Sequence, residues 1–249
     1  MKVGILGTGS YVPEKVLTND DLAKIVDTND EWITTRTGIK ERRIASENEA
    51  TSDLAFCAAK KAINDAGIDK NEIDLIIVAT MTPDHFTPST AALVQDKLGI
   101  KAAAFDISAA CTGFVYAFTT GYSFIKSGIY KKVLVIGAET MSRVMDWSDR
   151  GTCILFGDGS GAVVLGEVQT GGFCASHLVA DGSGACELIV PAGGSRKVVT
   201  VEALENKETY LQMNGREIFK FAVKVFPESV DDVLKQQNIT ADDIDLFIP

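Results

Sequence analysis

The sequence predicts an α/β fold, because helical and extended patterns alternate along most of its length. The apolar run DLIIVAT, residues 74–80, is typical of a strand that helices cover on both faces. The helical pattern at 50–66 stops at Gly67, as helices commonly do. With 249 residues, 46% of them hydrophobic, the chain is long enough for one large domain or two modest ones.

The same patterns locate the individual elements. Helices are expected at 50–66, 89–98, 111–126 and 214–237. Extended segments are expected at 2–7, 74–80, 102–107, 133–137, 162–168, 173–179 and 244–248. The glycine-rich segment GTGSYVP, residues 7–13, is expected to form a loop after the first strand.

An internal repeat is visible. GIDKNEIDLIIV (67–78) matches NITADDIDLFIP (238–249) at a constant offset of 171 residues, and each copy follows a helix. Chance similarity between two common helix–turn–strand units is the alternative explanation. A real duplication divides the chain into a first half, 1–170, and the start of a second, 171–249. A second half of equal length would end at about residue 337, roughly 90 residues beyond residue 249.

Composition and charge exclude several classes of protein. The five cysteines form no CxxC pair, so we expect no disulfide framework and no zinc site, and reduced thiols fit a cytoplasmic protein. A net charge of -10 argues against nucleic acid as a partner. No apolar run approaches the ~20 residues of a membrane helix, and the brief apolar N-terminus does not fit a signal peptide.

Cys111 is the candidate nucleophile. In DISAACTGFVYA, residues 106–117, it lies between an expected strand and an expected helix. The first N–H groups of a helix have no partner within it, so they stabilise a thiolate and can receive charge that develops on a thioester oxygen. The small neighbours Ala109, Ala110 and Gly113 leave room for a substrate. A buried structural cysteine is the alternative, because free Cys is among the most buried residue types.

This segment resembles the nucleophile region of β-ketoacyl-acyl carrier protein synthase III, a condensing enzyme of the thiolase superfamily. The resemblance extends over nearly the whole chain, through DEWITTRTGIKERR (30–43), GAET (137–140), DWSDRGTCILFGDGSGAVVL (146–165) and MNGREIFKFAV (213–223). It implies a thiolase-like fold, in which two duplicated α/β halves form a layered α-β-α-β-α sandwich, with the second half truncated here.

The resemblance also implies a reaction. Cys111 accepts the acyl group of acetyl-CoA or another short acyl-CoA, and malonyl-acyl carrier protein then condenses with it to start fatty-acid synthesis. A homodimer is implied, and no cofactor or metal besides the coenzyme A thioester substrate. A His and an Asn complete the family's site, and the His follows a segment similar to DLFIP, where this sequence stops. Neither His85 nor His177 matches it, so we expect the 249-residue chain alone to be inactive in condensation.

Further site residues follow from the resemblance. Trp32 and Arg150 are expected to sandwich the adenine of coenzyme A, with Thr28 at the same ring and Arg36 at a phosphate. The residues expected to line the acyl and pantetheine channel are Phe86, Phe156, Met213 and Phe219, of which Phe86 would cross a dimer interface. Taken alone, the aromatic residues could equally be core residues and the arginines solvated charges.

A local excess of positive charge is a candidate carrier-protein site. Arg36, Lys40, Arg42 and Arg43 lie within eight residues of an otherwise acidic chain, offset by Glu41. Such a cluster can receive an acidic carrier protein, although a solvated charged loop is as plausible. Lys220 resembles a carrier-docking residue of the family.

The sequence suggests three alternative functions. A related condensing enzyme of secondary metabolism would use CoA esters without a carrier protein. A non-catalytic acyl-CoA-binding module would bind the thioester without reacting. A dinucleotide-binding oxidoreductase is disfavoured, because Val12 occupies the third glycine position of the fingerprint and Pro13 follows it.

Overall fold

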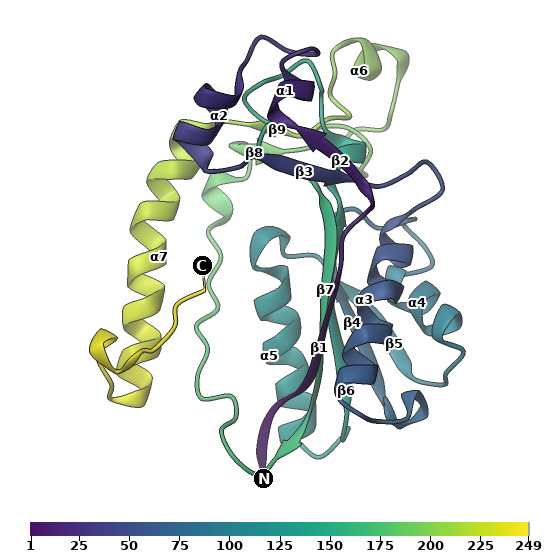
Figure 1. Ribbon diagram of the computed structural model, residues 1–249, viewed down its shortest axis with the longest axis vertical. Helices are drawn as coiled ribbons and strands as arrows, with labels where there is room; N and C mark the ends of the chain where they lie inside the picture. Colours follow the sequence, from purple (N-terminus) through teal and green to yellow (C-terminus); the bar gives the residue numbers. More distant parts are fainter. Residues whose placement is uncertain (249) are drawn as a thin grey trace. The chain divides into compact units, whose positions relative to one another are not determined.

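A five-stranded mixed sheet organises residues 1–172 (Figure 1). The strand order is β1 (Lys2–Tyr11), β7 (Asp158–Val168), β6 (Val133–Thr140), β4 (Leu75–Ala79) and β5 (Ala103–Ile107). Strand β4 runs parallel to both of its neighbours, whereas β7 is antiparallel to β1 and β6. The structure is a computed structural model that describes residues 1–248.

Helices cover both faces of this sheet. On one face lie α3 (Thr51–Asp65) and α4 (Thr90–Leu98), and on the other lies α5 (Gly113–Lys126) (Figure 1). Successive strand residues point to opposite faces, so Ile76 and Val78 pack with α3 and α4, while Leu75 and Ile77 pack with α5. All five residues of β4 are buried, which explains its uninterrupted apolar sequence.

The N-terminal strand is longer than the sequence predicts. The expected loop at residues 7–13 is wrong for its first five residues, because β1 continues to Tyr11 and pairs with β7. Gly7 and Gly9 permit this path, since a Cβ at either position would overlap the backbone of α3 at Ala62 or Ala58. The glycines therefore serve close helix–strand packing.

A smaller layer completes the first unit. Strands β2 (Lys15–Thr18) and β3 (Glu41–Ile44) form an antiparallel pair beside α1 (Asn19–Leu22) and α2 (Asp30–Thr37). The short turns of this unit are η1 (Lys70–Glu72), η2 (Ala110–Thr112) and η3 (Met141–Val144). Leu22, Ile33 and Cys153 form the buried centre of the cluster that packs this layer.

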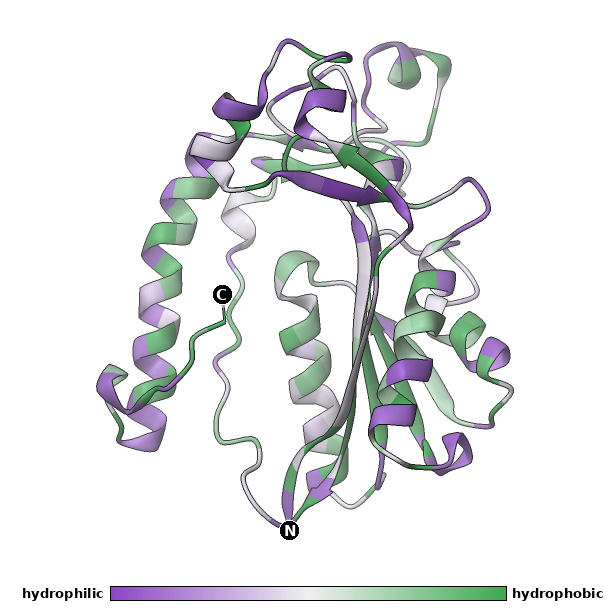
Figure 2. Cartoon of the chain, in the orientation of Figure 1, coloured by the Kyte–Doolittle hydropathy of each residue, from purple (hydrophilic) through white to green (hydrophobic). Residues whose placement is uncertain are grey.

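Residues 173–248 form a second compact unit. Its elements are η4 (Gly182–Gly184), β8 (Leu188–Ile189), α6 (Val201–Glu205), β9 (Gln212–Met213), α7 (Gly215–Gln237) and η5 (Ala241–Asp243). Strands β8 and β9 pair with each other, and α7 carries hydrophobic and hydrophilic residues along its whole length (Figure 2). The strands expected at 173–179 and 244–248 are wrong, because the described residues of this unit contain no strand that pairs with either segment.

The repeated sequence folds alike in both copies through its seventh residue. Helix α3 leads through Gly67, at φ 64°, to the capped turn η1, and α7 leads through Asn238, at φ 53°, to the capped turn η5. The N-cap residues Asp69 and Thr240 stand at equivalent positions, and each backbone N–H donates to a carboxylate three residues later. The copies then diverge, because only the first continues into a strand.

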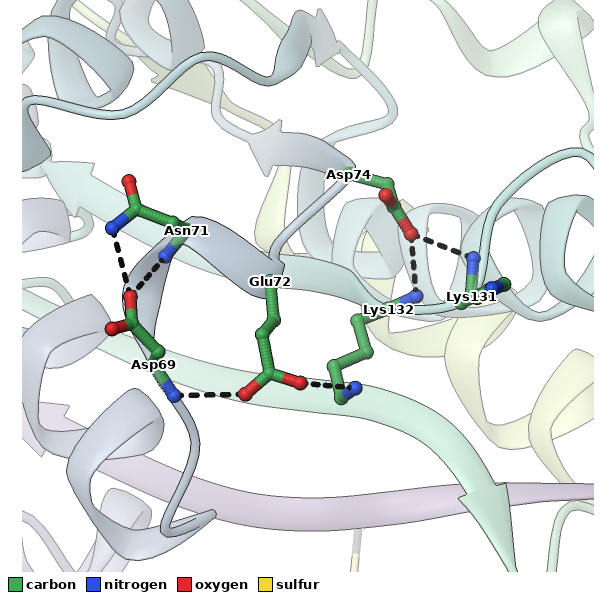
Figure 3. Close-up of polar contacts among 6 residues, drawn as sticks. All are labelled: Asp69, Asn71, Glu72, Asp74, Lys131 and Lys132. Atoms are coloured by element: carbon green, nitrogen blue, oxygen red, sulfur yellow. Dashed lines mark hydrogen bonds and ion pairs between the residues drawn. The ribbon is translucent and has the colours of Figure 1, made fainter.

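A carboxylate anchors that strand in the first copy (Figure 3). The side chain of Asp74 accepts the backbone N–H groups of Lys131 and Lys132, at 2.7 and 3.0 Å, just before β6 begins. Glu72 pairs with the Lys132 ammonium at 2.8 Å. These bonds fix the start of β6 beside the start of β4.

None of the helices in residues 1–248 combines the length and the apolar composition that crossing a bilayer requires.

Candidate active site

Cys111 lies in a short turn at the carboxyl ends of the parallel strands, directly after β5. The expected helix at 111–126 begins differently: η2 (Ala110–Thr112) is a 3₁₀ turn, and α5 starts at Gly113. Cys111 is an exposed residue. Its neighbour Ala110 has φ +46°, a left-handed conformation that costs a residue other than glycine about 1–2 kcal/mol. Such strain persists where the surrounding structure demands it, which is common at active sites.

A cavity of about 370 Å³ opens in front of this turn. The carboxyl ends of β4 and β6 and the start of β7 form it, the edge at which ligands commonly bind in α/β sheets. Its lining residues are Ala79, Met81, Ala110, Cys111, Phe114, Gly137, Ala138, Glu139, Met141, Phe156, Gly159, Ser160 and Gly161. The lining is mostly apolar, so an acyl chain fits it chemically.

The structure thus places two predicted residues, Cys111 and Phe156, at one cavity. Met81 and Glu139 were not predicted from the sequence, although Glu139 belongs to the motif GAET. A glutamate at the end of an apolar strand pattern was the available signal. Burial raises the pKa of the Glu139 carboxyl, against the lowering effect of its hydrogen bonds to Thr82, Met81 and Thr80.

A second group of predicted residues meets at Trp32. The Arg36 and Arg150 guanidinium carbons lie 4.5 and 5.1 Å from its ring centroid. Arg150 is also bonded to Asp27, at 2.9 Å to the backbone oxygen. The buried hydroxyl oxygen of Thr28 has no hydrogen-bond partner, which is unusual for a buried polar group. An adenine ring could lie between Trp32 and Arg150 only after this guanidinium moves away.

Arg42 is a correction to the sequence prediction. Its side chain is only 5% exposed and cannot reach a carrier protein. The guanidinium donates to Asn19 at 2.8 Å and to the backbone oxygens of Leu17 and Ile154. Burial lowers the pKa of this guanidinium. The residue therefore ties β3 to its surroundings. Arg43 keeps partial exposure, with an ion pair to Glu41 at 3.4 Å.

Phe86 is not among the residues that line the Cys111 cavity. Phe86 is 91% exposed in the segment between β4 and α4. In the second unit, Met213 ends β9, and Phe219 on α7 is 67% exposed. Lys220 is exposed and pairs with Glu217 at 2.6 Å. Within residues 1–248, no group of three or more His, Cys, Asp or Glu side chains is placed to hold a metal ion.

The fold is that of the thiolase-like condensing enzymes, and it places an exposed cysteine beside a mostly apolar cavity. The family model for 3-oxoacyl-[acyl-carrier-protein] synthase III matches residues 105–182, which include Cys111. β-Ketoacyl-[acyl-carrier-protein] synthase III of Caldanaerobacter subterraneus subsp. tengcongensis is 55% identical over 248 residues, which is 99% of this chain and 75% of that protein. The enzyme of the same name from Natranaerobius thermophilus is 54% identical over 250 residues, 98% of this chain and 76% of that one.

Solved structures agree. The 3-oxoacyl-[acyl-carrier-protein] synthase III of Aquifex aeolicus matches with a TM-score of 0.88 and 48% identity, over 98% of this chain and 75% of that one. The chain belongs to the β-ketoacyl-acyl carrier protein synthase III family, the condensing acyltransferases that initiate fatty-acid synthesis.

Proposed function

We propose that Cys111 receives the acyl group of acetyl-CoA, or of another short acyl-CoA, in the first half of the initiating condensation. The sulfur attacks the thioester carbonyl carbon, and the bond from that carbon to the coenzyme A sulfur breaks. Coenzyme A leaves as a thiol with the proton that Cys111 gave up. The observation that carries this proposal is an exposed cysteine on a strained turn, facing a largely apolar cavity.

The turn supports this chemistry in two ways. The dipole of α5 has its positive end at Gly113, next to the Cys111 turn, and favours negative charge there. The backbone N–H of Cys111 would donate to the oxygen that becomes negative as the sulfur adds. The aromatic rings of Phe114 and Phe156 line the space for the acyl group.

The nucleotide end of coenzyme A would bind at Trp32. Indole and guanidinium planes both stack on adenine, and the unpartnered Thr28 hydroxyl offers a polar contact to it. Arg36, which is exposed, would pair with a phosphate. Binding would break the contact between Arg150 and Trp32 and replace it with the stacked base.

In the second half-reaction, malonyl-acyl carrier protein would supply the extending carbons. Its carboxylate leaves as carbon dioxide, and the electron pair of the broken bond attacks the carbonyl carbon of acyl-Cys111. The Cys111 sulfur then leaves as a thiolate, and the product is a 3-oxoacyl thioester on the carrier. Arg43 and Lys220 are the candidate contacts to an acidic carrier, and Met213 and Phe219 would line the pantetheine channel.

We further propose a cytoplasmic homodimer that needs no cofactor besides the coenzyme A thioester substrate. An exposed phenylalanine such as Phe86 favours burial against another protein surface. Sedimentation of the wild type and of Phe86→Asp would test this, since a charge at a buried interface position should favour the monomer.

Labelled acetyl-CoA tests the central proposal. We expect one acetyl group per chain, located on Cys111 by peptide mass spectrometry, and no labelling of Cys111→Ala. The matched control is Cys186→Ala, because Cys186 is also exposed but lies in the other unit. Label on another residue, or full labelling of Cys111→Ala, would refute the assignment. Tight acyl-CoA binding without any acylation would favour a binding module.

The carrier requirement is tested separately on the acylated protein. We expect malonyl-acyl carrier protein to support condensation better than malonyl-CoA. An equal or better rate with malonyl-CoA would favour the carrier-independent enzyme of secondary metabolism.

A further inference from the structure

Two chain segments meet behind the Cys111 cavity. One is the segment Thr80–Met81–Thr82, which follows β4, and the other is the end of β6 at Glu139. Met81 and Glu139 both line the cavity, beside Cys111. The path of residues 80–82 therefore shapes the wall of the cavity at Met81.

The Glu139 carboxylate gathers hydrogen bonds from this one segment. One oxygen accepts the backbone N–H of Met81 at 2.8 Å. The other accepts the backbone N–H of Thr82 at 3.1 Å, the Thr82 hydroxyl at 2.5 Å and the Thr80 hydroxyl at 3.3 Å. All four partners donate, which suits a group that offers only acceptors when ionised.

Further hydrogen bonds hold the segment and the residues that follow it. The Thr51 hydroxyl donates to the Thr82 carbonyl oxygen, and the Thr82 hydroxyl accepts the Thr140 backbone N–H at 2.9 Å. Ser52 binds the Asp84 carboxylate through its backbone N–H and its hydroxyl. Thr82, Asp84 and Thr140 line a separate cavity of about 390 Å³, whereas Met81 and Glu139 line that of Cys111. Of these groups, Glu139 is the one that both binds the segment and lines the Cys111 cavity.

We infer that Glu139 is a positioning residue that sets the acyl-chain selectivity of the Cys111 cavity, by holding the backbone of Met81 and Thr82 in place. The inference rests on the proposed acyl transfer to Cys111. Glu139 acts through Met81, because its own oxygens are occupied by hydrogen bonds within the protein.

Glu139→Gln is the sharpest variant. It keeps the size of the side chain, but its NH₂ group would face N–H and O–H donors, so part of the segment must shift. Glu49→Gln is the matched control. Glu49 is likewise partly buried and bonded to Tyr11 and Ser46, but it lines the other cavity. Met81→Ala enlarges the cavity directly and shows how its size affects the choice between short and long acyl chains.

The experiment measures the rate of Cys111 acylation in the full chain, with acetyl-CoA and with hexanoyl-CoA, by intact-protein mass spectrometry. For Glu139→Gln we expect roughly a tenfold loss with acetyl-CoA, since small misplacements of a site are costly. We expect its ratio of hexanoyl to acetyl rates to change at least about threefold, in the direction that Met81→Ala gives. Glu49→Gln should keep both the rate and the ratio.

The ratio separates positioning from a structural role, because general loosening slows both substrates alike. An unchanged ratio in Glu139→Gln, with the wild type acylated normally, overturns this inference alone. A wild type that is not acylated at Cys111 overturns the proposed function. Thr82→Val removes one hydroxyl donor and provides a milder variant if Glu139→Gln does not fold. It should shift the ratio in the same direction, and an unchanged ratio there counts equally against the inference.

Discussion

The two copies of the internal repeat differ in what surrounds them. In the first unit, Ile73 leads into β4, which is buried between β5 and β6 and covered by helices on both faces. In the second, the equivalent Ile244 is 43% exposed, and the residues after it form no strand within the described chain. Local sequence therefore suffices for the cap and the turn, whereas the strand requires neighbours to pair with.

The largest expected difference is in the free energy of unfolding lost on truncating Ile77 or Ile248, which occupy equivalent positions in the repeat. Ile77 is fully buried in the core beneath α5, so Ile77→Ala should lower the free energy of unfolding by about 2–5 kcal/mol. Ile248 is 80% exposed, and Ile248→Ala should change it by less than about 0.5 kcal/mol. Urea unfolding followed by tryptophan fluorescence reports the first unit, which holds Trp32 and Trp147, and circular dichroism reports both units.

Equal losses for the two variants would contradict this comparison, because they would mean that residue 248 is as well packed as residue 77.

A smaller effect is expected where the two copies agree. Gly67 and Asn238 both adopt positive φ, and nothing lies within 4 Å of a Cβ built at Gly67. Gly67→Asn should therefore cost less than about 1 kcal/mol, because asparagine tolerates this conformation. Gly67→Val should cost about 1–2 kcal/mol more than Gly67→Asn, through backbone strain alone. Thermal unfolding of the two variants measures the difference, and equal midpoints would show that φ is not what limits this position.

The smallest expected effect is the pH dependence of the stability that Glu72 and Asp243 contribute at the turns η1 and η5. The ion pair with Lys132 and the backbone N–H of Asp69 hold the pKa of Glu72 below its usual value. The backbone N–H and hydroxyl of Thr240 do the same for Asp243. Because the folded pKa is lowered, each contribution to stability is present above about pH 4 and is lost as pH falls through the folded pKa.

Salt should change the pKa values of Glu72 and Asp243 to different extents. Concentrated NaCl screens the Lys132 ammonium, so the pKa of Glu72 should rise more than that of Asp243 in an NMR titration. Equal rises of the two pKa values would mean that the ion pair with Lys132 contributes little to the lowered pKa of Glu72.

Sequence patterns located the helices at 50–66 and 89–98 to within one residue, because caps and stop residues are local. The continuation of β1 past Gly7 was missed, since the glycines there serve contact with α3, and a loop has the same composition. The burial of Arg42 was missed for a related reason. An arginine in a basic cluster looks exposed until Asn19, Leu17 and Ile154 converge on it from distant parts of the chain.

By itself, the sequence determined the α/β class, the family and the candidate nucleophile Cys111. Helix ends, apolar runs and motifs consist of consecutive residues, so they can be recognised without the tertiary structure. Only the tertiary structure decided which copy of the repeat became a strand, and that Glu139 reaches the segment beside Met81. Strand pairing and side-chain clamps join residues far apart in the chain, and their geometry depends on how all the intervening elements pack.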